Sequence, residues 1–197
     1  AYPYAKRALG AAPAARNNRR FRCFRSRVRA GRAARLAMPR PVRQIRFNAF
    51  MMNCVTHLAP GQWTAPDDHA ADYLDPGYWV ALARKLEEGL FDSLFLGDIT
   101  GVYDVFGDSP GAALRTAAQV PMNDPVPLIP LMAHATGHLG FGVTVSVAYE
   151  PPYLLARRLT TLDHLSGGRV AWNVVTSYLE SGARSLGQRE LRAHDER

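Results

Sequence analysis

The chain has 197 residues, enough for one domain or for part of a larger one, and its hydrophobic content of 47% is that of an ordinary globular protein. No apolar run approaches the ~20 residues that a membrane-spanning helix needs, so we expect no membrane partner. The net charge of +7 comes from residues 1–37, which hold eleven Lys and Arg and no acidic residue; from Met38 onward 13 basic and 17 acidic residues give −4, so the domain itself gives no sign of a nucleic-acid partner.

The basic segment comes first along the chain. Its arginine-rich part, residues 16–37, has three interpretations: an organellar transit peptide, a basic arm that binds nucleic acid, or a disordered extension in front of a natural start at Met38. Ser26 is the single serine of this segment, which is few for a transit peptide, and no recognisable nucleic-acid fold follows it. We therefore interpret residues 1–42 as a basic, disordered leader and expect a cytoplasmic protein, with organellar targeting as the alternative.

From residue 43 onward, strand patterns alternate with helix patterns. The first strand is predicted from the alternation of Ile45, Phe47 and Ala49 with polar neighbours. The helices are predicted from apolar side chains at helical spacing and from glycines at their ends. In chain order we predict strand 43–50, helix 77–90, strand 91–98, helix 126–138, strand 139–147, helix 152–168, strand 169–177 and the start of a further helix within 181–195.

Four strand–helix repeats with nearly continuous apolar strands predict a parallel sheet with helices packed outside it. An open doubly wound sheet and a (β/α)8 barrel both have this order. Residues 47–57 lack the glycine-rich phosphate turn that a doubly wound nucleotide fold would place after its first strand. We therefore predict an α/β fold in which residues 43–197 form a partial TIM (β/α)8 barrel, about its first four βα units.

Polar side chains follow the predicted strands. In a (β/α)8 barrel the C-terminal ends of the strands share one site, so we expect these side chains to converge there. Neither cysteine belongs to a disulfide framework or has metal-ligand spacing, and we expect no metal. The polar residues at the strand ends are Asn53, Cys54, His57, Asp98, Tyr103, Thr144, Ser146, Asn173, Thr176 and Ser177.

Five segments carry a more specific signal. In chain order they read FNAFMMNCVTHLAPGQW, FDSLFLGDITGVYDVFGD, QVPMNDPVPLI, YEPPYLLARRLTTLDHLSGGRVAWNVVTS and AHDER. Together they resemble the bacterial-luciferase-like flavin monooxygenases, in the branch of the nitrilotriacetate, dibenzothiophene-sulfone and long-chain alkane monooxygenases. The resemblance runs from about Arg43 to Arg197, and WNVVTS after LDxLSGGR is its most specific part.

The resemblance implies a TIM-type barrel and a two-component, FMN-dependent monooxygenase. In such a system an NAD(P)H:flavin reductase supplies reduced FMN, O2 converts it to a flavin C4a-hydroperoxide, and one oxygen atom enters a hydrophobic or organosulfur small molecule such as a long-chain alkane. A homo-oligomer is implied for the full-length protein. Two alternatives stay open: a deazaflavin-dependent hydride-transfer oxidoreductase, which WNVVTS disfavours, and a truncated or degenerate luciferase-like protein without catalysis.

The resemblance also implies roles for individual residues. Asp98 and Ser177 correspond to FMN-contacting positions, and Thr144 is a third candidate, since a flavin edge offers both donors and acceptors. His57 is the candidate donor of a hydrogen bond or a proton, because histidine titrates near neutral pH. The residues that correspond to the substrate and catalytic side are Cys54, His57, Tyr103, Gln119 and Asn123.

Two departures from the family pattern are visible. Tyr178 stands where the alkane enzyme has a histidine, which alters a contact on the substrate side. Relatives also continue past AHDER with a tyrosine that touches the flavin and with the second half of the barrel. We therefore expect this chain to be the N-terminal half of a luciferase-like barrel, with two unpaired sheet edges, and to bind FMN weakly or not at all by itself.

Overall fold

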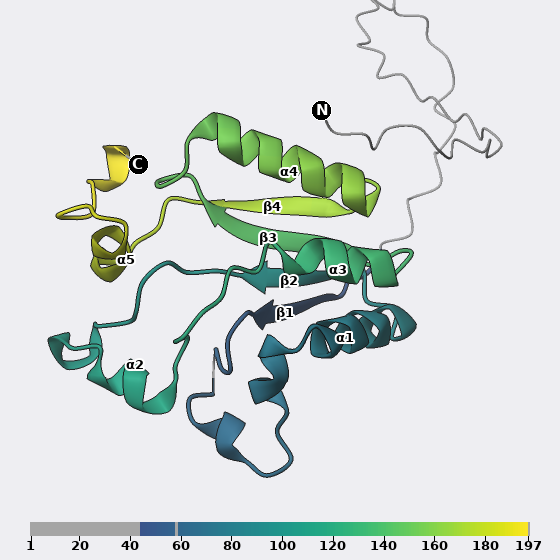
Figure 1. Cartoon of the computed structure of the whole chain (residues 1–197), viewed down its shortest axis with the longest axis horizontal. Helices are drawn as coiled ribbons and strands as arrows, with labels where there is room; N and C mark the ends of the chain where they lie inside the picture. The colour runs from purple at the N-terminus through teal and green to yellow at the C-terminus, as the bar shows by residue number, and fades with distance from the viewer. Residues whose placement is uncertain (1–43, 58, 197) are drawn as a thin grey trace, which may run out of the picture. The chain divides into compact units, whose positions relative to one another are not determined.

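A computed structural model describes residues 44–57 and 59–196, so the expectations for the leader, residues 1–42, lie outside the described part of the chain. Strands and helices alternate along that part (Figure 1). No helix in it is long and apolar enough to cross a lipid bilayer. In order, the elements are β1 Asn48–Met52, α1 Pro76–Glu88, β2 Ser93–Gly97, α2 Gly111–Thr116, α3 Leu128–Ala135, β3 Gly140–Ser146, α4 Pro152–Ser166, β4 Val170–Val175 and α5 Glu180–Ser185.

The four strands form one parallel sheet in the order β1-β2-β3-β4, which confirms the predicted topology. Each crossover carries a helix, as parallel neighbours require. Because the strands are parallel, their C-terminal ends lie at one edge of the sheet, on the side of α2 and α5 (Figure 1). The register pairs Met52 with Gly97 and Thr144 with Asn173, so residues from strands far apart in sequence end beside one another.

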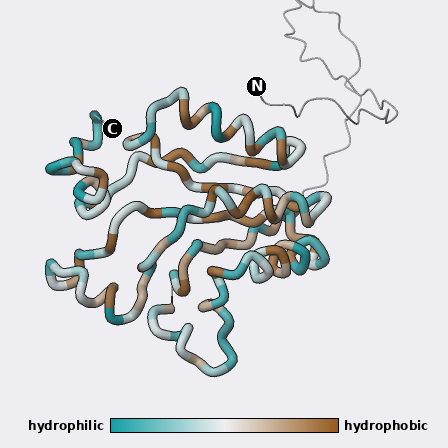
Figure 2. Tube along the Cα trace, in the orientation of Figure 1, coloured by the Kyte–Doolittle hydropathy of each residue, from teal (hydrophilic) through white to brown (hydrophobic). Residues whose placement is uncertain are grey.

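One face of the sheet packs against α1, α3 and α4. Leu94, Leu96 and Phe141 point to this side and are almost completely buried. Figure 2 shows the hydrophobic residues concentrated on the strands and on α3. The helices contribute Trp79, Ala83, Leu86, Ile129, Met132, Leu155 and Leu162 to the same core.

The other face of the sheet carries glycines beneath aromatic rings. A Cβ atom on Gly97 would lie 2.8 Å from the Phe50 ring, and one on Gly142 would lie 2.9 Å from the Phe95 ring. The two rings contact each other with centroids 5.4 Å apart. Glycine is needed at both positions because the ring of the neighbouring strand occupies the space of a side chain.

The predicted first strand was wrong at its beginning. Ile45 and Phe47, two apolar residues of the predicted alternation, are 79% and 59% exposed, and β1 begins at Asn48. The ladder ends at Asp92: the Phe47 carbonyl accepts from the Asp92 N–H at 2.9 Å, but the Phe47 N–H donates to the Asp92 carboxylate at 2.9 Å instead of to a backbone carbonyl. An alternating sequence does not extend a strand where a side chain takes the place of the next ladder bond.

Two predicted helices are shorter than their patterns. The helix predicted at 126–138 is α3, which begins at Leu128 because it follows Pro127 and ends where Thr136 becomes extended. The segment 181–195 contains only the short helix α5 and a later 3-10 turn among its described residues. The other boundaries agree with the predictions to within a few residues.

A single guanidinium joins the elements at the opposite end of the sheet. Arg169, which directly precedes β4, donates Nη2 to the Ala133 carbonyl at 2.7 Å and Nη1 to the Leu139 carbonyl at 2.8 Å. Its Nε donates to the Ser166 carbonyl at 2.8 Å, and Thr136 accepts two further bonds. The planar fork of arginine thereby satisfies carbonyls at the ends of α3 and α4 and at the start of β3.

Replacing Arg169 by lysine tests this network. Arg169→Lys keeps the charge but loses the five-donor fork, so the free energy of unfolding should fall by about 2–3 kcal/mol. Denaturant unfolding measures the loss. The control is Arg157→Lys, an exposed position on α4, which should stay within about 0.5 kcal/mol of the wild type. Equal effects at both positions would show that the network does not hold the fold.

Candidate active site

The three residues predicted to bind the cofactor line one small cavity at the C-terminal ends of β2, β3 and β4. Asp98 follows β2, Thr144 lies in β3, and Ser177 follows β4. The cavity has a volume of about 90 Å³ and is completed by Ile99, Thr100, Ser146, Val175 and Tyr178.

Hydrogen bonds between strand ends hold the hydroxyls of this cavity in place. Asn173 donates its side-chain amide to the Thr144 hydroxyl at 3.0 Å, and the hydroxyls of Ser146 and Ser177 are 2.9 Å apart. Ser177 has a φ of +65°, a left-handed conformation that turns the chain sharply out of β4. The amide inside β4 therefore positions a neighbouring hydroxyl.

Asp98 is the acidic group of the cavity. Removal of its carboxyl from solvent and the nearby charge of Asp124 raise its pKa from 3.8 to about 6, although a hydrogen bond from the Ile99 backbone N–H opposes the shift. A carboxyl group held in this environment binds a proton more strongly than an exposed one. Such perturbed groups concentrate at functional sites.

A second and larger cavity, of about 640 Å³, lies beside the segment between β2 and α3. Three of the residues predicted for the substrate side line it: His57, Tyr103 and Gln119. The rest of the lining is mostly apolar and comprises Pro60, Val105, Phe106, Ser109, Ala112, Ala113, Thr116 and Ala118.

His57 is held by two contacts. Its Nδ1 forms a short hydrogen bond with the side-chain Nε2 of Gln119, and its ring lies against Phe50 with centroids 4.8 Å apart. Partial removal of the imidazole from solvent lowers the pKa of His57 below 6.5, which favours the neutral ring at neutral pH. When Nδ1 accepts from the Gln119 amide, the single hydrogen of the neutral imidazole is on Nε2.

Gln119 is buried, with 6% of its surface exposed, and its Oε1 has no hydrogen-bond partner among the described residues. Its backbone is left-handed, with a φ of +55°, and its N–H donates to the Thr56 carbonyl at 3.2 Å. The Asn123 N–H makes a similar bond to the Asn53 carbonyl at 2.9 Å. The segment before α3 is thus attached to the loop after β1, which brings Gln119 to His57.

The remaining two predicted residues lie elsewhere. Cys54 is buried, its thiol donates to the Thr56 carbonyl at 3.2 Å, and it lines a separate cavity of about 260 Å³ with His57. Burial raises the pKa of the Cys54 thiol, which disfavours a thiolate. Asn123 has an exposed side chain and lines neither the 90 Å³ nor the 640 Å³ cavity. Cys54 therefore shares a cavity with His57 but not with Gln119, and Asn123 shares a cavity with neither.

Tyr178, which the sequence analysis placed at an altered contact on the substrate side, lies between the two cavities. Its hydroxyl makes a short hydrogen bond to that of Tyr103, with ring centroids 6.4 Å apart. Tyr178 lines the 90 Å³ cavity and Tyr103 the 640 Å³ cavity. The signal was its position immediately after Ser177, at the exit of β4.

Comparison with known proteins identifies the family. Residues 46–197 match the family model of the luciferase-like monooxygenases. The chain belongs to this family. It is 55% identical over 155 residues to a dimethyl-sulfide monooxygenase of Hyphomicrobium sulfonivorans and 52% identical over 155 residues to a long-chain alkane monooxygenase of Geobacillus thermodenitrificans. These alignments cover 79% of this chain but 32% and 35% of the two relatives, so the chain spans about a third of their length.

Solved structures agree with this assignment. A long-chain alkane monooxygenase superposes with a TM-score of 0.75 at 51% identity, over 78% of this chain and 36% of that one. A riboflavin lyase solved with modified FMN and riboflavin superposes with a TM-score of 0.72 at 33% identity, over 78% and 34%. The four parallel strands and their helices therefore match part of a luciferase-like TIM barrel, which confirms the predicted fold class.

The small cavity fits one edge of a flavin. Its carboxyl and hydroxyl groups can exchange hydrogen bonds with the polar atoms of an isoalloxazine or a ribityl chain. Its volume of about 90 Å³ is well below the ~300–1,000 Å³ of cavities that enclose a ligand of that size. The described residues can thus contact a flavin from one side without enclosing it.

The raised pKa of Asp98 predicts a pH-dependent stability. Between pH 3.8 and about 6 the folded state binds more protons than the unfolded state, so this group makes the protein less stable as pH rises through that window. Asp98→Asn should therefore raise the free energy of unfolding at pH 7 by about 1–3 kcal/mol. Urea titrations at pH 4 and pH 7 measure the difference. Asp163→Asn, on the exposed side of α4, is the control and should change the free energy of unfolding by no more than about 0.5 kcal/mol.

Gly97 should control the position of His57 through Phe50. Gly97→Ala places a methyl group 2.8 Å from the Phe50 ring, so the Phe50 ring must move. The same ring packs against the imidazole of His57. We expect a stability loss of about 1–3 kcal/mol together with shifted imidazole NMR signals of His57. Gly137→Ala is the matched control, since a Cβ there meets nothing within 4 Å. Unmoved His57 signals in Gly97→Ala would contradict this coupling.

Proposed function

We propose that residues 43–197 supply the N-terminal half of the barrel of an FMN-dependent monooxygenase that oxidises a hydrophobic or organosulfur small molecule. The observation that carries the proposal is a pair of neighbouring cavities in a chain of the luciferase-like monooxygenase family: a small one that holds a carboxyl and several hydroxyl groups, and a large one that is mostly apolar. When bound, reduced FMN supplies the activation of O2. A separate NAD(P)H:flavin reductase would provide the reduced flavin.

The small cavity is the proposed flavin side. Asp98, Thr144 and Ser177 come from three adjacent parallel strands and line one cavity, so we expect all three to face the same edge of the cofactor. Thr144 is fixed by Asn173, and the Ser177 hydroxyl lies beside that of Ser146. Hydroxyls fixed in advance lose little conformational entropy when a ligand binds.

The large cavity is the proposed substrate side. Val105, Phe106 and the alanines of α2 give it an apolar wall that favours a hydrophobic molecule. His57 lies at its edge, and in the tautomer whose Nδ1 accepts from the Gln119 amide the ring holds its proton at Nε2. We propose that this Nε2–H group donates a hydrogen bond at the place where oxygen is transferred.

An oxygen-incorporation experiment tests the proposed function. The protein translated from the complete reading frame around this chain is mixed with reduced FMN and ¹⁸O2, with dimethyl sulfide or hexadecane as substrate. Mass spectrometry should detect one ¹⁸O atom in an oxidised product of at least one of them. His57→Phe should lower the product yield by about 10²-fold or more while FMN affinity stays within a few fold. Hydrogen peroxide as the sole product, with FMN bound, would favour a protein without catalysis.

Flavin binding by residues 43–197 alone is a separate test. Since the described residues offer one side of a flavin site, fluorescence titration of this piece with FMN should show weak binding or none. Asp98→Asn and Ser177→Ala in the protein from the complete reading frame should each weaken FMN binding by about 5- to 20-fold. Tight FMN binding by the isolated piece would contradict the proposal that it forms only part of the site.

A further inference from the structure

The Tyr103–Tyr178 hydrogen bond joins a residue of the large cavity to a residue of the small one. Tyr103 belongs to the lining of the large cavity and Tyr178 to that of the small one, and their hydroxyls are in direct contact. This hydrogen bond thus links a residue on the proposed substrate side to a residue on the proposed flavin side.

The two loops that carry these tyrosines are attached to each other. The Ser181 hydroxyl donates to the Val102 carbonyl at 2.6 Å and accepts from the Val102 N–H at 3.1 Å. Arg184 and Asp104 form an ion pair at 3.0 Å. Gly101 and α5 approach so closely that a Cβ on Gly101 would lie 2.4 Å from a backbone nitrogen of α5. The loop after β2 and the start of α5 therefore hold the tyrosine pair in position.

The pair has one hydrogen more than its own bond requires. Each phenol carries one hydroxyl hydrogen, and one of the two is used between the rings. Although Tyr178 is 61% exposed, loss of solvent and the bond to Tyr103 raise its pKa above the ordinary value, so it keeps its proton at neutral pH. The second hydrogen is left for an acceptor. The Thr116 hydroxyl, also on the large cavity, donates to the Ala112 carbonyl at 3.0 Å instead.

We propose that Tyr178, acting through its hydrogen bond to Tyr103, is a specificity-determining residue that favours substrates with a lone-pair acceptor, such as a sulfone or other sulfur–oxygen group, over plain hydrocarbons. The proposal rests on the proposed assignment of the large cavity to the substrate. In this arrangement the Tyr178 hydroxyl donates to the Tyr103 oxygen, so the hydroxyl hydrogen of Tyr103 is left to bind an acceptor in the large cavity. A phenylalanine at either position removes this arrangement while keeping the ring.

Binding of two matched probes tests the proposal without flavin or O2. Diphenyl sulfone and diphenylmethane have similar shapes, but only the sulfone carries acceptor oxygens. Calorimetric titration of the protein from the complete reading frame should show about ten-fold tighter binding of the sulfone. Tyr178→Phe should reduce this preference to about two-fold or less, mainly by weakening sulfone binding.

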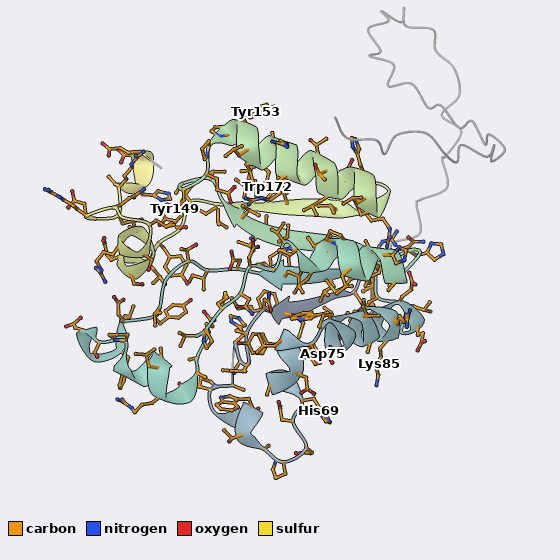
Figure 3. All side chains as sticks on the ribbon, viewed as in Figure 1. His69, Asp75, Lys85, Tyr149, Tyr153 and Trp172 are labelled. Atoms are coloured by element: carbon orange, nitrogen blue, oxygen red, sulfur yellow. The ribbon has the colours of Figure 1, made fainter. Side chains whose placement is uncertain are left out.

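Three variants complete the design. Tyr103→Phe should reduce the preference as much as Tyr178→Phe does, and the double variant should add little, because both remove the same hydrogen bond. Tyr103→Phe also takes over the test if circular dichroism shows that Tyr178→Phe is unfolded. The control is Tyr153→Phe, a tyrosine that is 76% exposed at the start of α4 (Figure 3), which should keep the ten-fold preference.

The outcomes separate this proposal from the proposed function. A ten-fold preference that survives in Tyr178→Phe, equal binding of both probes by the wild type, or binding of neither would each overturn the role of the tyrosine pair. None of these results depends on FMN or oxygen transfer. Conversely, a protein that shows the predicted preference but incorporates no ¹⁸O would keep the tyrosine pair as a binding determinant and remove the oxygenase function.

Discussion

The candidate site depends on the parallel register of the sheet, and Arg169 is the side chain that anchors this register at its far end. Its guanidinium satisfies carbonyls of three elements, while its own carbonyl accepts from the Phe141 N–H at 2.7 Å. This bond starts the β3–β4 ladder, which continues in step to the Thr144–Asn173 pair. A slip of one residue would turn every side chain to the other face of the sheet. The polar residues at the strand exits therefore meet because a network at the opposite end fixes the strands.

The inner face of the sheet shows how the same strands make room for a site. Gly97 and Gly142 accept the rings of Phe50 and Phe95, so the aromatic side chains lie flat along the sheet instead of standing into the space above it. Phe50 then supports the ring of His57. The contact with Phe50 thus reduces the solvent access of His57, a residue that lines the large cavity, and reduced solvent access lowers the pKa of this histidine. Packing and site chemistry are not separate parts of this structure.

Sequence reasoning predicted the sheet, its parallel order and the cavity formed by Asp98, Thr144 and Ser177, because each depends on local periodicity or on a strand exit. It could not predict that β1 starts at Asn48, since that depends on the Asp92 carboxylate taking the place of the next ladder bond. It named Gln119 and Asn123 only through family resemblance, because both lie in an irregular segment whose path is fixed by backbone bonds to the loop after β1. The contact between Tyr103 and Tyr178 was invisible for the same reason: it joins loops 75 residues apart in the chain.

The position of the tyrosine pair has a consequence for how the site can change. Most residues that line the large cavity belong to the segment between β2 and α3, and His57 joins them from the loop after β1. The small cavity is built from residues at the exits of β2, β3 and β4. Substitutions in the apolar wall can therefore alter the substrate side without moving Asp98 or Ser177. Tyr178 differs, because it follows Ser177 directly in the chain and bonds to the other cavity through Tyr103. A change at Tyr178 therefore acts on both cavities at once, so under the proposed assignment we expect it to couple the choice of substrate to the placement of the flavin.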